Sequence, residues 1–143
     1  ISISRQNSTG FWTQPDGRLR NIRPDIVVKL TQLNKSIVLD TKWKYKSDTS
    51  VEDARQMYAY GHYFKAEFGF LIYPEKLDGD HKVLVQSGPF EKSEVVNFDN
   101  QHCGLLWVDL MNEENKIDKN IGITIIQELI RYINIKNENS VKQ

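Results

Sequence analysis

The sequence predicts an α/β protein in which a mixed β-sheet is flanked by helices, and three observations support this class. Residues 24–30 and 36–44 are two alternating, β-branched segments joined by a short polar stretch, a pattern typical of a β-hairpin. Apolar residues then recur at helical spacing between residues 50 and 64. The continuous apolar run 68–73 follows, which is typical of a strand buried on both faces of a sheet.

The remaining segments extend this sheet. Ile1 and Ile3 alternate with serines, as in a strand. The turn signal at residues 15–17 predicts a hairpin within residues 10–20, and we expect further strands at 82–86, 94–98 and 104–110. Isoleucine and leucine at helical spacing predict an amphipathic helix at 120–135.

Length and composition indicate one domain, residues 1–137, followed by a polar tail at 138–143. Because the chain begins without Met and within a strand-like pattern, we infer that it is a fragment of a longer protein. It has no apolar stretch long enough to cross a bilayer and no secretory signal, so we expect no membrane partner and a cytoplasmic location. Its single cysteine, Cys103, cannot form an intrachain disulfide, which fits a reducing compartment.

Positive charge is concentrated in one segment, although the chain as a whole has a formal net charge of zero. Between residues 18 and 46 the only acids are Asp25 and Asp40. A zero net charge argues against a globally basic DNA-binding protein, so any contact with nucleic acid is expected to be local. A solvated basic face explains the charge equally well. The cations are Arg18, Arg20, Arg23, Lys29, Lys35, Lys42, Lys44 and Lys46.

The predicted hairpin brings three charged side chains to one face of the sheet. If residues 32–35 form its turn, Thr31 lies opposite Ser36, and counting outward places Val27 opposite Asp40 and Asp25 opposite Lys42. Two carboxylates on neighbouring strands are then close enough to share a cation, and Mg²⁺ is the ion that prefers such oxygen ligands. An ion held in this way stabilises the charge that develops when a phosphodiester is attacked and lowers the pKa of a bound water. Lys42 would orient that water or steady the phosphate.

These motifs resemble those of a known nuclease superfamily. Pro24-Asp25, then Asp40-Thr41-Lys42, and a helix carrying Gln56 and Tyr60 resemble the PD-(D/E)xK nucleases, whose core is a restriction-endonuclease-like sheet. Within that superfamily, residues 53–61 and 71–74 are similar to McrC, the nuclease subunit of McrBC-type, modification-dependent restriction systems. The resemblance covers residues 23–74, about a third of the chain.

The resemblance implies a role for each matching residue. Asp25 and Asp40 would ligate the metal with the backbone carbonyl of Thr41, and Lys42 would be catalytic. Gln56 and Tyr60, four residues apart on one helical face, would support the site and lie towards the DNA backbone. The implied cofactor is Mg²⁺, with Mn²⁺ as a substitute, and the implied partners are DNA and a GTPase motor subunit of the McrB type. Many relatives carry a further acid on a helix before the first core strand, and this sequence predicts no such helix.

Three alternatives remain open from the sequence. The chain is either an McrC-like endonuclease domain, another PD-(D/E)xK nuclease of the recombination or transposition type, or a non-catalytic domain that keeps the fold for DNA binding or assembly. The alternative to a functional site is that Lys42 forms an exposed ion pair with Asp25 or Asp40. The histidines lack metal-ligand spacing, and Trp12, Trp43 and Trp107 are expected in the core. The sequence does not indicate which base or DNA sequence would be recognised or how many metal ions would be bound. It also does not indicate the oligomeric state or any additional acidic ligand upstream.

Overall fold

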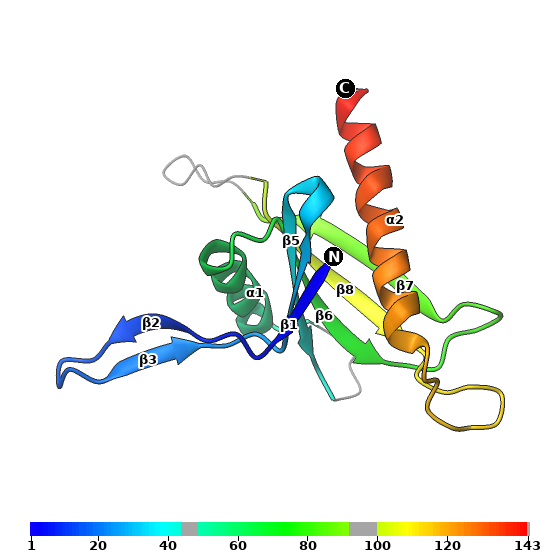
Figure 1. The fold of residues 1–143 in the computed structure, drawn as a ribbon, viewed down its shortest axis with the longest axis horizontal. Helices are drawn as coiled ribbons and strands as arrows, with labels where there is room; N and C mark the ends of the chain where they lie inside the picture. Colours follow the sequence, from blue (N-terminus) through cyan, green and yellow to red (C-terminus); the bar gives the residue numbers. More distant parts are fainter. Residues whose placement is uncertain (44–48, 92–99, 143) are drawn as a thin grey trace.

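The computed structural model describes residues 1–43, 49–91 and 100–142, which form a six-stranded mixed sheet and a separate two-stranded one (Figure 1). Strands β5, β6 and β8 are parallel to one another, β4 and β7 pair antiparallel with β5 and β8, and β1 pairs antiparallel with β4. The predicted class of a mixed sheet flanked by helices is confirmed, and the arrangement is consistent with a restriction-endonuclease-like core. In spatial order the strands are β1 (Ser2–Arg5), β4 (Ile26–Leu30), β5 (Lys35–Thr41), β6 (Phe68–Pro74), β8 (His102–Val108) and β7 (Val83–Pro89).

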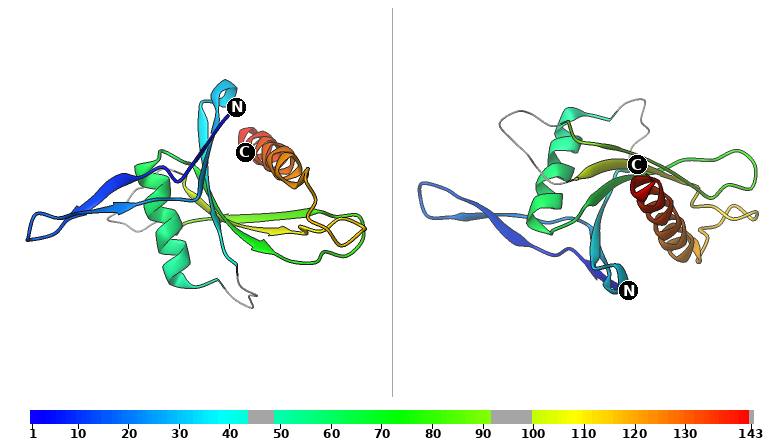
Figure 2. Two further views of the ribbon diagram at one scale, coloured as in Figure 1. Left: turned by 60° about the horizontal axis from the view of Figure 1, so that its bottom comes forward. Right: turned by 90° about the horizontal axis from the view of Figure 1, so that it is seen from above.

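Two helices cover opposite faces of this sheet (Figure 2). Helix α1 (Val51–Tyr63) packs on the face that contains Val38 and Leu71, whereas α2 (Ile121–Val141) packs on the face that contains Phe70. Successive residues of a strand point to opposite faces, so the buried strand β6 supplies side chains to both layers. The sheet therefore has two separate cores, which we call the α1 face and the α2 face.

The segment before β4 forms a hairpin of its own. Strands β2 (Thr9–Thr13) and β3 (Leu19–Ile22) pair antiparallel, as predicted for residues 10–20. Gly17 has a φ of +85°, a left-handed conformation that glycine adopts without steric cost, and its amide donates to the carbonyl of Gln14. The turn therefore lies where the Pro-Asp-Gly signal placed it.

The register predicted for the β4–β5 hairpin is wrong by two residues. A short 3₁₀ helix, η1 (Thr31–Leu33), and a left-handed Asn34 make the turn one position earlier on each strand, so Leu30 lies opposite Lys35 and Val27 opposite Val38. Extended by one residue, this register places Asp25 opposite Asp40 rather than opposite Lys42. Because a shift of two residues preserves the alternation of a strand, the predicted shared face survives the error.

Several other boundaries differ from the sequence prediction. Strands β7 and β8 run a few residues from the predicted positions, and α2 continues to Val141, through most of the segment predicted as a polar tail. The strand predicted at 94–98 and the cations Lys44 and Lys46 lie outside the described residues. Neither of the two helices among the described residues combines the length and hydrophobicity needed to cross a bilayer.

The tryptophans were predicted in the core, and two of them are not there. Trp12 is 53% exposed and Trp43 is 77% exposed, whereas Trp107 is partly buried against the α1 face. Trp12 lies on the small hairpin, which lacks a second layer to cover it, and Trp43 follows the end of β5. Aromatic residues are buried by packing partners, and among the described residues no layer covers either side chain.

Candidate active site

The structure brings all of the sequence-predicted site residues together at the carboxyl end of β5. Asp25 directly precedes β4, Asp40 and Thr41 end β5, and Lys42 follows. Strand alternation places Asp25 and Asp40 on the α1 face, since they continue the rows of Val27 and Val38. Helix α1 crosses the same face and supplies further polar side chains. We call this group the acidic cluster, and its members are Asp25, Asp40, Lys42 and Asp53, with Gln56 and Tyr60 beside them.

Asp25 is held by the strand next to it. Its Oδ2 accepts a hydrogen bond of 2.7 Å from the backbone amide of Thr41 and one of 2.5 Å from the Thr41 hydroxyl. The Asp25 carbonyl, in turn, accepts from the amide of Gln6 at 2.9 Å. The carboxylate is therefore fixed across the end of the β4–β5 pair, in reach of the backbone of Thr41.

Lys42 bridges the sheet and the helix. Its Nζ lies 2.8 Å from Oδ2 of Asp40 and 3.3 Å from Oδ1 of Asp53, and all three side chains are less than a fifth exposed. The Lys42 amide donates to the carbonyl of Ile72 at 2.8 Å, so the backbone stays attached to β6 after β5 ends. The interpretation of these charges as an exposed surface ion pair is therefore wrong, because the group is largely buried.

Gln56 and Tyr60 continue this network along α1. Lys42 Nζ donates to Oε1 of Gln56 at 3.0 Å, Gln56 Nε2 donates to the Tyr60 hydroxyl at 2.8 Å, and that hydroxyl donates to the carbonyl of Arg23 at 3.2 Å. Tyr60 is buried, so its ring packs in the α1 face while its hydroxyl faces the cluster. The chain of hydrogen bonds fixes the amide of Gln56 and thereby the position of the ammonium group.

Negative charge exceeds positive charge in the cluster, and the pKa values reflect this. Burial raises the pKa of Asp40; the hydrogen bond and charge of Lys42 oppose the rise, while the charges of Asp25 and Asp53 add to it. Burial by itself would lower the pKa of Lys42, but its contacts with Asp40 and Asp53 raise it overall. Lys42 is therefore a cation at neutral pH and acts as a hydrogen-bond donor rather than as a base.

Asp53 is a member of the cluster that the sequence did not reveal. In the sequence it has the position of an ordinary acid in the first turn of a helix, and Ser50 caps that helix, since the Ser50 hydroxyl accepts a hydrogen bond from the Asp53 amide at 3.1 Å. The signal that would have found it is its spacing. Asp53 lies three residues before Gln56 and seven before Tyr60, which places all three on one helical face.

The donor set of the cluster suits a hard divalent cation. Three carboxylates face one ammonium group, which leaves an excess of two negative charges in a partly buried site, and carboxylate oxygens are the ligands that Mg²⁺ prefers. Within residues 1–43, 49–91 and 100–142, no three His, Cys, Asp or Glu side chains are already grouped around one point as metal ligands. Asp25 and Asp40 on adjacent strands therefore offer two carboxylates, and further ligands would come from the backbone or from water.

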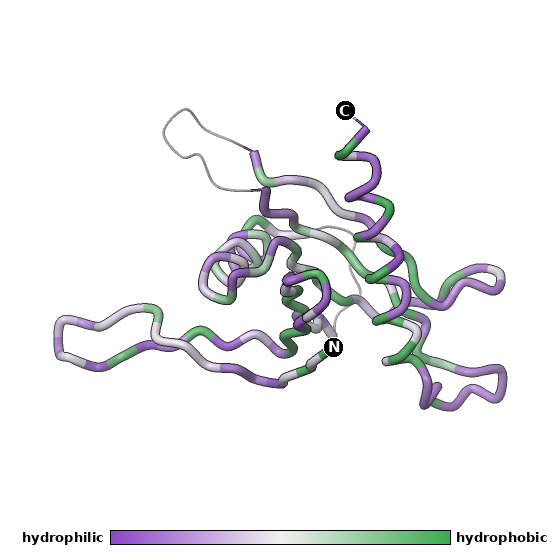
Figure 3. The backbone as a smooth tube through the Cα atoms, turned by 45° about the horizontal axis from the view of Figure 1, so that its top comes forward, coloured by the Kyte–Doolittle hydropathy of each residue, from purple (hydrophilic) through white to green (hydrophobic). Residues whose placement is uncertain are grey.

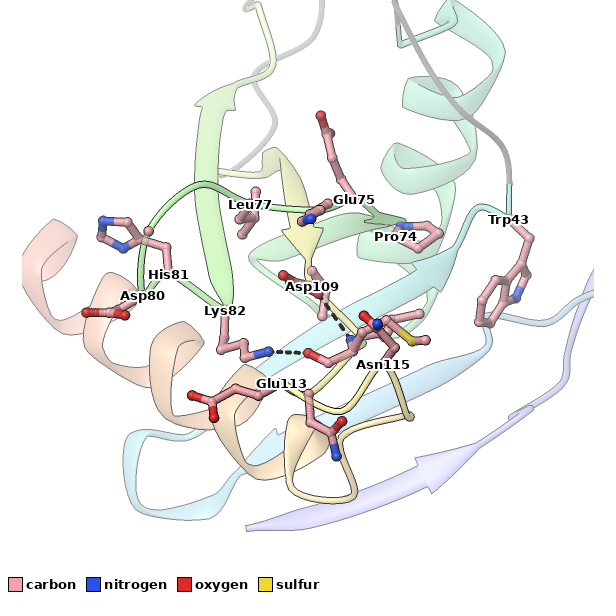
Figure 4. A pocket seen from close by; sticks show the side chains of 16 residues that line it. Trp43, Pro74, Glu75, Leu77, Asp80, His81, Lys82, Asp109, Glu113 and Asn115 are labelled. Carbon is pink, nitrogen blue, oxygen red and sulfur yellow. Dashed lines mark hydrogen bonds between the residues drawn. The ribbon is translucent and has the colours of Figure 1, made fainter.

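A hollow of about 830 Å³ lies between Trp43 and the loops after β6 and β8, and no member of the acidic cluster lines it (Figure 4). Trp43, which follows Lys42, stands at one side, and the loops after β6 and β8 form the walls with Pro74 and Lys82. Four acids line this hollow, against two lysines, so it is unfavourable for a phosphate. The acids are Glu75, Asp80, Asp109 and Glu113.

Comparison with known proteins gives one match. A family model described as McrBC 5-methylcytosine restriction system component matches residues 2–74, just over half of the 143-residue chain. The matched segment contains every member of the acidic cluster as well as Gln56 and Tyr60. No curated protein and no solved structure matches the chain.

Proposed function

The chain belongs to the McrBC 5-methylcytosine restriction system component family, and we propose that within such a system it is the McrC-like, PD-(D/E)xK domain that cleaves DNA. The observation that carries the proposal is the convergence of Asp25 and Asp40 with the ammonium group of Lys42 on one face of the sheet. These are the groups that metal-assisted phosphodiester hydrolysis requires.

Asp25, Asp40 and the backbone carbonyl of Thr41 would hold Mg²⁺, for which Mn²⁺ would substitute. The ion would supply charge stabilisation at the phosphoryl oxygens and a water of lowered pKa. Lys42, protonated and held by Asp40, Asp53 and Gln56, would turn one of its three N–H groups from these partners to the phosphate or to the attacking water when substrate binds. Gln56 and Tyr60 would act through Lys42, because both are engaged in hydrogen bonds that lead to it.

The proposal includes two partners. DNA would be the substrate, and a GTPase motor subunit of the McrB type would bring the domain to modified sites. The match to a restriction-system family supports an assembly of this kind, and the acidic cluster supports assigning the cleavage of DNA within it to this chain. A chain that cleaves DNA without any such motor would be a PD-(D/E)xK nuclease of another type.

Plasmid nicking tests the proposal. We expect cleavage of supercoiled plasmid with Mg²⁺ or Mn²⁺ and none with EDTA. Asp40→Ala and Lys42→Ala should each lower the rate by roughly 10²–10³-fold, the range for loss of one group that stabilises a transition state. Asp80→Ala and Lys119→Ala serve as matched controls, since both residues are exposed and outside the cluster.

The outcomes separate the enzyme from a binding module. Metal-dependent nicking that disappears in Asp40→Ala but persists in Asp80→Ala supports the proposal. DNA binding without nicking, unchanged in Asp40→Ala, would identify a non-catalytic domain that keeps the fold. Equal rates in Lys42→Ala and wild type would contradict the role of Lys42 even if the protein is a nuclease.

A further inference from the structure

The hairpin formed by β2 and β3, together with its turn, projects from the rest of the domain. We call residues 9–22 the arm. Its strands pair with each other and with no strand of the six-stranded sheet, and it extends beyond that sheet in every view (Figures 1 and 2). An isolated two-stranded hairpin is marginally stable in water, so an arm of this length is expected to have a binding partner.

The base of the arm is attached to the acidic cluster. Strand β3 continues through Arg23 and Pro24 directly into Asp25, and the Arg23 carbonyl accepts the hydrogen bond of the Tyr60 hydroxyl. On the other strand, the ring of Phe11 contacts the ring of Tyr63 on α1 at a centroid distance of 5.6 Å. Both contacts fix the direction in which the arm leaves the cluster.

The charges of the arm suit a polyanion. Asp16 is its only acid, and the guanidinium of Arg18 lies 2.6 Å from that carboxylate. Arg20 donates to the amide oxygen of Gln14 at 3.0 Å, an uncharged partner. Across the described parts of the chain, neither Arg20 nor Arg23 forms an ion pair with a carboxylate, so both positive charges remain uncompensated.

One face of the arm combines charge with an aromatic ring. Trp12 lies directly opposite Arg20 in the β2–β3 register, and both side chains are exposed. Hydrophilic and hydrophobic segments alternate along the arm (Figure 3). An indole beside a guanidinium suits stacking on a base or sugar together with contact to a phosphate. A two-stranded ribbon is also narrow enough to enter the major groove of B-DNA, which is about 12 Å wide.

We propose that the arm binds duplex DNA beside the bond to be cleaved, an inference that rests on the proposed function because it assigns the arm to the same substrate. Arg20 and Arg23 would contact phosphates, and Trp12 would pack against the DNA between them. Arginine contacts to phosphate position a protein on DNA without reading its sequence, so the arm sets the placement of the duplex on the cluster.

The length of the arm determines how much of a duplex it can contact. From Asp25 to the turn at Gly17 the chain runs eight residues, which at about 3.3 Å per residue is roughly 26 Å. This distance corresponds to about 8 base pairs of B-DNA at 3.4 Å each. A duplex that ends closer to the cleaved bond than this cannot contact the whole arm.

The experiment measures binding of a fluorescent duplex to the protein in Ca²⁺ by anisotropy, and nicking of plasmid in Mg²⁺. The duplex is about 30 base pairs long, so that it spans both the cluster and the arm. The variants are Arg20→Ala and Trp12→Ala, with Arg131→Ala as the matched control. Arg131 is an exposed arginine on α2, which lies on the opposite face of the sheet from the cluster.

We expect Arg20→Ala and Trp12→Ala to weaken binding of the duplex by about tenfold each, and Arg20→Ala to lower the salt dependence by about one phosphate contact. Arg131→Ala should bind the duplex as wild type does. Wild-type binding of the duplex by both arm variants, with nicking intact, would overturn the inference and leave the proposed function standing. Weaker binding in the arm variants without any nicking by wild type would support the arm and contradict the nuclease.

Discussion

The two faces of the central sheet differ in how they are built. On the α2 face the strands bury apolar side chains, among them Ile37 and Leu39 of β5, against Leu129 and Ile133 of α2. On the α1 face the same strand buries Val38 and then Asp40, and α1 places Asp53 and Gln56 over the end of that row. Because side chains alternate along β5, those that point to the α2 face stabilise the fold, and those that point to the α1 face include the charged residue of the cluster.

The difference has an energetic consequence. Removing apolar atoms from the α2 face costs transfer free energy and leaves a cavity, whereas removing an acid from the α1 face relieves repulsion among Asp25, Asp40 and Asp53.

The largest effect is expected from Phe70→Ala on the α2 face. Phe70 is fully buried, and its ring packs at the centre of this layer, so the substitution should lower the free energy of unfolding by about 3–5 kcal/mol. Urea unfolding measures this value. Ile123→Ala on the exposed side of α2 is the control and should change it by less than about 0.5 kcal/mol. A loss below about 1 kcal/mol for Phe70→Ala would show that this face does not dominate stability.

A smaller effect, on activity alone, is expected from Asp53→Asn. The substitution removes one of the two carboxylates that hold Lys42, so the ammonium group loses part of its orientation. We expect the nicking rate to fall about tenfold, which corresponds to about 1.4 kcal/mol, with the free energy of unfolding unchanged or raised. Glu128→Gln, the same change at an acid on α2, should leave the rate as it is. An unaltered rate in Asp53→Asn would remove Asp53 from the functional site.

The smallest effect is a pH dependence of stability. The pKa of Asp40 is raised above its ordinary value of 3.8 in the folded protein, mainly by burial, so the unfolded chain ionises first as the pH increases. The contribution of Asp40 to the stability of the folded protein therefore falls as the pH rises from about 4 towards the raised pKa, and Asp40→Asn lacks this loss.

Relative to wild type, Asp40→Asn should become more stable as the pH rises from about 4 towards 7, measured by urea unfolding in EDTA. Asp80→Asn provides the control, since this exposed acid should show no such trend. A difference that runs the other way, with wild type gaining stability over the same range, would mean that ionised Asp40 stabilises the fold.

The sequence predicted which residues share a face better than it predicted how strands align. Alternation of apolar residues determines the parity of a strand, and parity alone places Asp25, Asp40 and Lys42 together. The offset between strands depends on the turn, and the left-handed Asn34 was not identifiable from its neighbours. The sequence therefore predicted the correct face for the three charged residues, although it predicted the wrong register for the two strands.

What the sequence missed follows from tertiary contacts. Asp53 has an ordinary local explanation as an acid at a helix start, and only the approach of α1 to β5 brings it to Lys42. Trp12 and Trp43 have the composition of core residues, but their exposure depends on the absence of a covering layer over the described part of the arm and at the end of β5. Local patterns carry no information about which layers are missing.

The most direct test of the account is a crystal of the protein soaked in Mn²⁺, with the ion located by its anomalous scattering. The account predicts a peak between the carboxylates of Asp25 and Asp40 that is lost in Asp40→Ala. A peak among the acids of the hollow, such as Glu75 and Asp109, with none at Asp25 and Asp40, would contradict it.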